Sequence, residues 1–108
     1  MTQRICKSSD ITENGREFRI SGKGGIFYLM IFRRGTRLLA YHNSCPHRDR
    51  SLNFAPDRFL IGKDGLLVCS HHGAAFDIDS GLCVQGPCEG SSLQAIDIVI
   101  RDDEIWLK

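Results

Sequence analysis

The segment CSHHGAAFD, residues 69–77, decides how the rest of this chain is interpreted. It offers one thiol, Cys69, and one imidazole, His72, in a C-x-x-H spacing. A second short segment, CPH, offers Cys45 and His47 in a C-x-H spacing. Each segment reads as a tight turn, which aims neighbouring side chains at one point and leaves backbone N–H groups free to donate to metal-bound sulfur. We therefore interpret the two segments as two boxes of one metal site.

Two kinds of metal centre accept two thiolates and two imidazoles. One is tetrahedral zinc, which binds both sulfur and nitrogen. The other is a [2Fe-2S] cluster in which two histidines replace two cysteines on one iron. Zinc fingers usually pair Cys with Cys and His with His, whereas each box here mixes the two. A cluster with one all-Cys iron and one all-His iron needs mixed boxes on two facing loops. The spacing favours the cluster, and a structural zinc module stays as the alternative.

Composition narrows the class of protein. The chain has 108 residues, enough for a single domain, with 25% charged and 42% apolar residues. A net charge of +1 gives no indication of nucleic acid or an anionic membrane as a partner. Since no apolar run approaches the length of a transmembrane helix and the first ten residues hold no signal-peptide core, we expect a cytoplasmic protein without a membrane span.

The compartment matters for the five cysteines. In a reducing compartment, cysteines beside histidines are metal ligands before they are disulfides. Cys83 and Cys88, which flank the tripeptide QGP, are expected to be buried thiols, in preference to a disulfide or to extra shielding of the metal. Cys6 is expected to be a small core or edge residue.

Short strand-like stretches alternate with Gly- and Pro-rich turns along the chain. Residues 26–33 and 37–42 predict a hairpin, residues 94–100 alternate with one isoleucine face, and residues 104–107 predict a closing strand. Further short strands are predicted at residues 18–21, 66–69 and 75–78. Because no segment of ten or more residues has a helical period, the sequence predicts a small all-β fold, an antiparallel sandwich or barrel.

The middle of the chain differs from its two ends. Residues 43–90 hold all three prolines, four of the five cysteines and three of the four histidines. We therefore expect one domain, with a β base made from residues 1–42 and 91–108. Residues 43–90 form an inserted, loop-rich lobe that organises the metal centre.

The two boxes, together with SGLCVQGP (residues 80–87) and DEIWL (residues 103–107), resemble the Rieske ferredoxin family. The resemblance covers about residues 40 to 108. It implies the Rieske fold and one Rieske-type [2Fe-2S] cluster, with a covering loop at residues 80–87. The spacing between the boxes is somewhat longer than in most members, and the extra length, residues 53–65, is expected to be a surface loop.

For the ligands, the resemblance implies Cys45, His47, Cys69 and His72. It also implies a potential at the low end of the Rieske range. High-potential members carry a serine and a tyrosine hydroxyl beside the second box, where this chain has Ala74 and Phe76. They also carry an extra cysteine in each box, forming a disulfide between the loops, and neither box here has one.

Four other residues are expected to have ordinary structural roles. His71 is expected at the surface, and His42, at the end of a predicted strand, as an ordinary surface or hydrogen-bonded histidine. Asp77 is expected to accept hydrogen bonds from backbone amides of its turn. Trp106 is expected to pack in the core of the base.

The chain is not expected to be an enzyme. It has no nucleotide-binding fingerprint, and only His42 and His71 would remain for a second iron of the kind that Rieske oxygenases carry. We expect a one-electron carrier that links a reductase to an acceptor such as an oxygenase. The alternative from another class is a small subunit or regulatory module of a larger redox enzyme, of the nitrite reductase kind.

Overall fold

The computed structural model describes residues 3–22, 24–46, 51–69 and 73–108. In these residues no helix is long and apolar enough to cross a membrane. The elements, in chain order, are β1 (Gln3–Lys7), the short 3-10 helix η1 (Ser8–Asp10), β2 (Arg16–Gly22), β3 (Gly25–Arg34), β4 (Arg37–His42), β5 (Leu60–Ile61), β6 (Leu67–Val68), β7 (Ala75–Phe76), β8 (Cys83–Gln85), β9 (Ile98–Arg101) and β10 (Glu104–Leu107).

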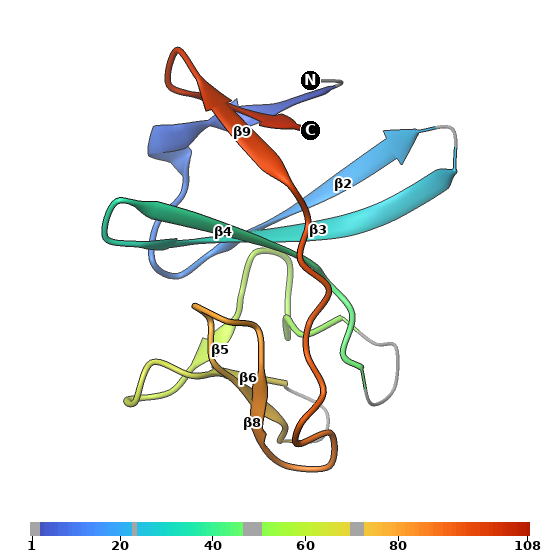
Figure 1. Ribbon diagram of the computed structural model, residues 1–108, viewed down its shortest axis with the longest axis vertical. Coiled ribbons are helices and arrows are strands. Elements are labelled where there is room, and N and C mark those ends of the chain that lie inside the picture. The colour runs from blue at the N-terminus through green and yellow to red at the C-terminus, as the bar shows by residue number, and fades with distance from the viewer. Residues whose placement is uncertain (1–2, 23, 47–50, 70–72) are drawn as a thin grey trace.

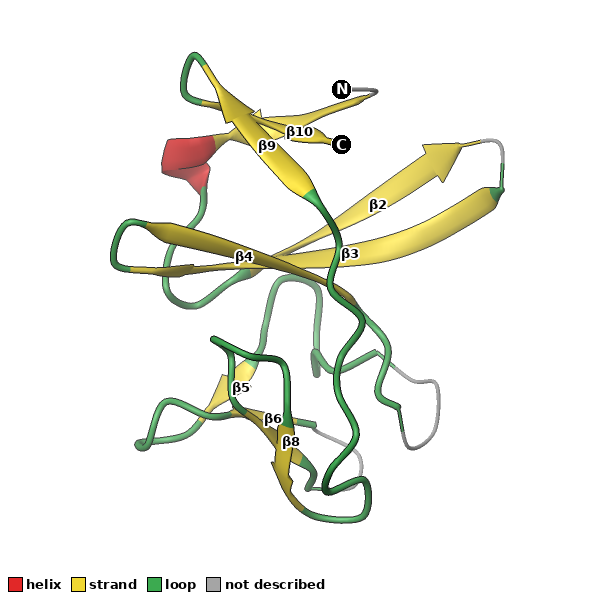
Figure 2. Cartoon of the chain, viewed as in Figure 1, coloured by secondary structure: helices red, strands yellow, loops and turns green. Residues whose placement is uncertain are grey.

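The strands form three antiparallel sheets that lie one above another (Figure 1). The upper sheet has the order β1-β10-β9, the middle sheet β2-β3-β4, and the lower sheet β5-β6-β7-β8. Gln3 pairs with Leu107, so the first and last strands meet in the upper sheet. Figure 2 shows that the lower part consists mostly of loops between very short strands, whereas the middle sheet has long ones.

The middle sheet separates two cores. The upper core consists of Cys6, Ile11, Ile20, Leu29, Ile31, Ala40 and Ile105. The lower core consists of Met30, Phe32, Tyr41, Cys45, Leu52, Leu67, Cys69, Ala74, Phe76, Ile78, Cys83, Cys88 and Leu93. Successive side chains of a strand point to opposite faces, so β3 serves both cores. Leu29 and Ile31 face one core, and Met30 and Phe32 face the other. The unbroken apolar run in β3 follows from this burial on both faces.

The sequence predictions of an all-β fold and of a hairpin are confirmed. β3 and β4 pair antiparallel from Leu29↔His42 to Arg34↔Arg37. Gly35, in the turn between them, has a φ of +62°, a backbone conformation that glycine adopts without steric cost. The predicted closing strand coincides with β10.

Other predictions were wrong in detail. The strand predicted at residues 94–100 begins only at Ile98, because the preceding residues run along the edge of β4 with one isolated bridge, Tyr41↔Ala95. The closing strand buries Ile105 completely and leaves Trp106 half-buried outside the upper core, because alternate residues face opposite ways. The sequence analysis also did not find β1, β5 or β8.

The insertion between the boxes is more than a surface loop. It supplies β5, which adds an edge strand to the lower sheet. Phe59 also packs its ring against Phe32, with ring centroids 5.1 Å apart. The extra residues therefore add apolar contacts to the lower core.

Candidate metal centre

The two cysteines of the predicted site are buried in the same lower core. Cys45 is 0% exposed and Cys69 is 1% exposed. Their predicted partners, His47 and His72, lie outside the described residues, as does His71. Within the described part of the chain, which lacks these histidines, no three His, Cys, Asp or Glu side chains come together as a metal site. Two of the four predicted ligands, Cys45 and Cys69, therefore lie in the same buried core.

Two backbone hydrogen bonds join the ends of the ligand-bearing part of the second box. The Cys69 N–H donates to the Ala74 carbonyl at 2.7 Å, and the Gly73 N–H donates back to the Cys69 carbonyl at 3.1 Å. Ala74 is completely buried, and β7 starts directly after it. These bonds bring Cys69 and Ala74 together within the lower core.

The first box is closed at its base by a buried asparagine. The Oδ1 of Asn43 accepts the N–H of Leu52 at 2.8 Å, which ties a residue that precedes the box to one that follows it. The Nδ2 of Asn43 donates to the carboxylate of Glu17 at 2.6 Å and to the Oδ1 of Asn53 at 2.9 Å. Sequence reasoning missed this network, because a single Asn at the end of a strand resembles any turn residue.

The predicted covering turn packs on the second box. Gly86 has a φ of +99°, and a Cβ placed on it would lie 2.8 Å from the Cα of Ala74. The ends of the turn are held together, since the Gly90 N–H donates to the Cys83 carbonyl at 3.0 Å and the Cys83 N–H to the Ser91 carbonyl at 2.8 Å. Only a glycine allows the turn to approach the second box this closely.

Two further thiols lie beside Cys45. The Sγ atoms of Cys83 and Cys88 are 3.1 Å apart, and the Cys83 thiol also donates to the Gln85 carbonyl at 3.3 Å. Burial, together with the neighbouring sulfurs of Cys83 and Cys45, raises the pKa of Cys88 to about 12. The expectation of buried thiols at both positions is confirmed.

The hydroxyl groups that mark high-potential relatives are absent from the expected positions. Ala74 and Phe76 are both 0% exposed and belong to the lower core. The buried Tyr41 hydroxyl donates to the Ile78 carbonyl at 2.6 Å, so its single proton is already engaged. Burial raises the pKa of Tyr41, and the carboxylates of Asp77 and Asp79 add to the rise.

The remaining predicted residues have structural roles. Asp77 accepts the N–H of Asp79 through its Oδ1 at 3.0 Å, as expected. His42 is half-buried and contacts the ring of Phe27, with centroids 5.7 Å apart. Cys6 is 6% exposed in the upper core, remote in sequence from both boxes.

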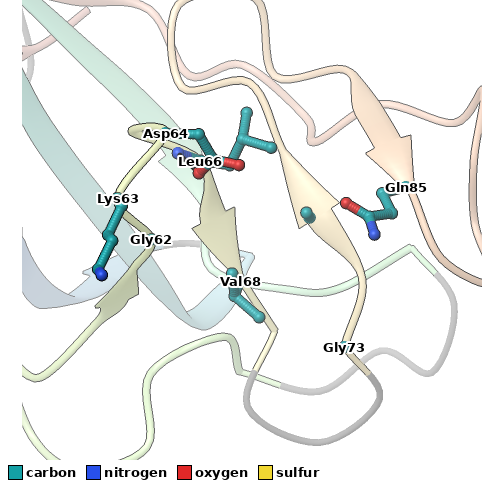
Figure 3. Close-up of a pocket in the computed structure, with 8 residues that line it drawn as sticks. Gly62, Lys63, Asp64, Leu66, Val68, Gly73 and Gln85 are labelled. Carbon is teal, nitrogen blue, oxygen red and sulfur yellow. Dashed lines mark hydrogen bonds between the residues drawn. The ribbon is translucent and has the colours of Figure 1, made fainter.

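A shallow cavity of about 370 Å³ lies on the outside of the lower sheet (Figure 3). Its lining includes Val68, Ala75 and Gln85, which are register partners across β6, β7 and β8. Neither Cys45 nor Cys69 lines it. The cavity therefore borders the second box through Gly73 and Ala75 and does not include the two described cysteines.

Comparison with known proteins identifies the family. The chain matches the family described as Rieske [2Fe-2S] domain over residues 1–99. It is 25% identical over 104 residues to ferredoxin CarAc of Metapseudomonas resinovorans, covering 96% of this chain and 90% of that protein. The structure resembles the ferredoxin of carbazole 1,9a-dioxygenase from Nocardioides aromaticivorans IC177, with a TM-score of 0.74, 23% identity and coverage of 96% and 93%.

A second solved structure is similar over almost its entire length. It is a chain of the complex of reduced oxygenase and oxidized ferredoxin in carbazole 1,9a-dioxygenase, with a TM-score of 0.71 and 25% identity. The match covers 97% of this chain and 99% of that one.

The described residues fit a [2Fe-2S] cluster, the group that the family name specifies. Thiolates are the usual ligands of iron–sulfur clusters, and Cys45 and Cys69 offer two of them in a core closed to water. The closed turn of the second box and the Asn43 network hold the ends of both ligand segments. One Rieske-type [2Fe-2S] cluster is the cofactor, and the chain belongs to the Rieske [2Fe-2S] domain family.

Proposed function

We propose that this protein is a one-electron carrier that takes electrons from a reductase and passes them to an oxygenase. Its cluster is bound by Cys45, His47, Cys69 and His72. The observation that carries the proposal is the burial of Cys45 and Cys69 in one core. Each cysteine belongs to a segment whose flanking residues are joined by hydrogen bonds. The choice of an oxygenase as acceptor is supported by the similar structures, one a ferredoxin of carbazole 1,9a-dioxygenase and the other a chain of a complex of oxygenase and ferredoxin.

When bound, a Rieske cluster supplies a one-electron couple in the range of roughly −150 to +300 mV. The residues of this chain set the environment of that couple. The lower core excludes water from the sulfurs of Cys45 and Cys69. Since Ala74 and Phe76 donate no hydroxyl hydrogen bond to metal-bound sulfur, less of the negative charge added on reduction is stabilised. We infer a potential in the lower part of the range.

We assign residues 43–90 to the cluster-binding lobe, carried by a base of residues 1–42 and 91–108. The lower core supports this division, because its cysteines all come from the lobe while Met30, Phe32 and Tyr41 come from the base. We also place the protein in the cytoplasm. A reducing compartment favours cysteines beside histidines as metal ligands, which is the role proposed here for Cys45 and Cys69.

The ligand assignment is tested by spectroscopy of purified protein. His47→Cys and His72→Cys should each retain iron, lower the reduction potential and change the visible and EPR spectra, because a thiolate adds negative charge to the cluster. His42→Cys is the matched control, since it adds a thiol to the base, and its spectra should equal those of the wild type. Unchanged spectra in the two ligand variants, or a colourless protein that contains zinc, would refute the assignment.

The carrier role needs a separate experiment. The protein is reduced chemically, mixed with a purified Rieske oxygenase, and its reoxidation is followed by stopped-flow absorbance. A carrier should transfer one electron per cluster and then dissociate, because contacts between redox partners are small and transient. Co-elution with the acceptor as a permanent complex would instead favour a subunit of a larger redox enzyme.

A further inference from the structure

Cys83 and Cys88 form a pair that neither the fold nor the proposed ligand set explains. Their Sγ atoms lie 3.1 Å apart. A disulfide requires about 2.05 Å between sulfurs, so a shift of about 1 Å would join them. Both side chains are buried, with exposed fractions of 1% for Cys83 and 7% for Cys88.

The backbone around the pair is already arranged as a closed hairpin-like loop. Cys83 is bonded through its N–H to Ser91 and through its carbonyl to Gly90, and the Ser91 N–H donates to the Cys88 carbonyl at 2.9 Å. The two cysteines therefore stay close without the help of a covalent bond. Because the native loop already holds the thiols together, their oxidation costs little additional chain entropy.

The pair also lies close to solvent. The residues between the two cysteines, Val84–Pro87 in the chain, are all exposed, as is Glu89 on the other side of Cys88. A small disulfide can thus approach Cys88 after a modest opening of the turn. Burial of the thiols makes this approach slow, on the scale of minutes to hours.

From this geometry we propose that Cys83 and Cys88 are a second redox site, a dithiol that low-molecular-weight disulfides such as glutathione disulfide oxidise to an intramolecular disulfide. The site goes beyond the proposed electron carriage, because neither cysteine is a proposed cluster ligand. It also differs from the disulfide of high-potential relatives, which joins the two ligand boxes, since Cys83 lies within the covering turn and Cys88 directly follows it.

The reaction is a two-step exchange. When the turn opens and Cys88, the more exposed of the two, reaches solvent, its thiol loses a proton to water. The thiolate then attacks glutathione disulfide, forms a mixed disulfide and releases one glutathione. The sulfur of Cys83 then displaces the second glutathione and forms the Cys83–Cys88 bond. The protein loses two electrons and two protons. Glutathione disulfide gains them and leaves as two glutathione thiols. The product closes the covering turn next to Cys45.

The test uses the iron-loaded wild-type protein, so it does not depend on a variant that folds. The protein is incubated anaerobically for several hours over a range of glutathione disulfide to glutathione ratios, with the visible spectrum recorded throughout. After quenching in acid, the protein is returned to neutral pH in denaturant, where free thiols are labelled with N-ethylmaleimide. The digest is then analysed by mass spectrometry. As the ratio rises, labelling at Cys83 and Cys88 should fall together to below about a tenth, with an internally linked peptide appearing. Cys6 should stay labelled and the cluster absorbance should persist.

Two variants identify the partners. In Cys83→Ala, Cys88 should keep its label or carry a single glutathione, and no internally linked peptide should form. Cys6→Ala, which removes a buried cysteine from the other core, should leave the linked peptide unchanged. The proposal is overturned if both thiols stay labelled in pure glutathione disulfide. It is equally overturned if the link forms only after the cluster absorbance is lost, or if Cys88 is internally linked in Cys83→Ala. Loss of the Rieske spectrum in untreated protein would count against the proposed function instead.

Discussion

The upper and lower cores of this molecule are built in different ways. The upper core is aliphatic, contains a single cysteine, and is enclosed by the longer strands of two sheets. The lower core contains four cysteines, and its own sheet has strands of only two or three residues. Both cores bury apolar side chains, but the segments around the upper core are joined mainly by ladder hydrogen bonds, whereas the segments from the middle of the chain around the lower core are joined mainly by turn hydrogen bonds.

This difference indicates where the cofactor matters for stability. A small domain buries a limited apolar area, so a group that binds only the folded state adds stability where it binds. The lower core has the least backbone pairing and the most metal-ligating side chains. We therefore expect the cluster to be part of its architecture, while the upper core should persist without iron. The five predictions below test this contrast, from the largest expected effect to the smallest.

Removing one cysteine from each core should give the largest difference between the upper and lower cores. Cys45→Ala should abolish cluster binding, because it deletes a proposed ligand, whereas Cys6→Ala should retain full iron content. Iron and sulfide analysis of both purified variants, with visible spectra, measures the effect. Loss of iron from Cys6→Ala, or full iron in Cys45→Ala, would contradict the assignment of the metal to the lower core.

Removal of iron from the wild type should loosen one core selectively. Without the cluster, amide exchange in β6, β7 and β8 should become at least about 100-fold faster, equivalent to about 2.7 kcal/mol of lost binding free energy. Exchange in β1, β9 and β10 should change little, because the upper sheet contributes none of the proposed ligands. Hydrogen exchange with mass spectrometry compares the two. Equal acceleration in both sheets would mean that the domain unfolds as one unit.

The close approach of the covering turn to the second box can be tested with two glycines that differ in their surroundings. Gly86→Ala puts a methyl group 2.8 Å from the Ala74 Cα, whereas Gly90→Ala, with a similar φ of +93°, meets nothing within 4 Å. Both substitutions carry the strain of a positive φ, about 1–2 kcal/mol. Gly86→Ala should cost a further 1–3 kcal/mol or so through steric overlap. Equal free energies of unfolding in denaturant would show that the turn can move away freely.

The Asn43 network should matter more for holding the first box than for the upper core. Asn43→Ala leaves the buried N–H of Leu52 without its acceptor, at a cost of about 1–3 kcal/mol. Iron should then be released faster to a chelator. Asn53→Ala is the control, because Asn53 bonds the same Glu17 carboxylate but does not bridge the ends of the box. Similar chelation rates in both variants would rule out a special role for Asn43.

The smallest effect is expected at the boundary between the cores. Tyr41→Phe removes the hydrogen bond to the Ile78 carbonyl and should lower the free energy of unfolding by about 1 kcal/mol. The folded protein raises the pKa of Tyr41 above its ordinary value of 10.0, so the folded state holds this proton more tightly. The contribution is complete below pH 10 and is lost as the pH rises through the raised pKa. Denaturant titrations should show the two proteins converging in that alkaline range, and a constant difference would contradict the assignment.

The success of the sequence predictions depended on how local each feature is. The β3–β4 hairpin was predictable, because a strand, a turn and a strand follow one another within a few residues. Residues 94–97 were predicted as part of a strand from their alternation. Whether they form a ladder depends on the partner edge, and the edge of β4 offers them a single bridge. The extra residues between the boxes could not be placed for a similar reason, since Phe59 finds its partner, Phe32, on a distant strand.

The sequence by itself determined which thiols and imidazoles are proposed as ligands, because these side chains are recognised by type and the two boxes are short and local. It also determined the all-β class, through turn residues and the absence of a helical period. Only the tertiary structure decided which faces are buried, because burial depends on what packs above and below a strand. It showed that β3 serves two cores, that Asn43 joins the ends of the first box, and that Gly86 must lack a side chain beside Ala74. The same folding brings the Sγ atoms of Cys83 and Cys88 to 3.1 Å, in a segment closed by backbone hydrogen bonds.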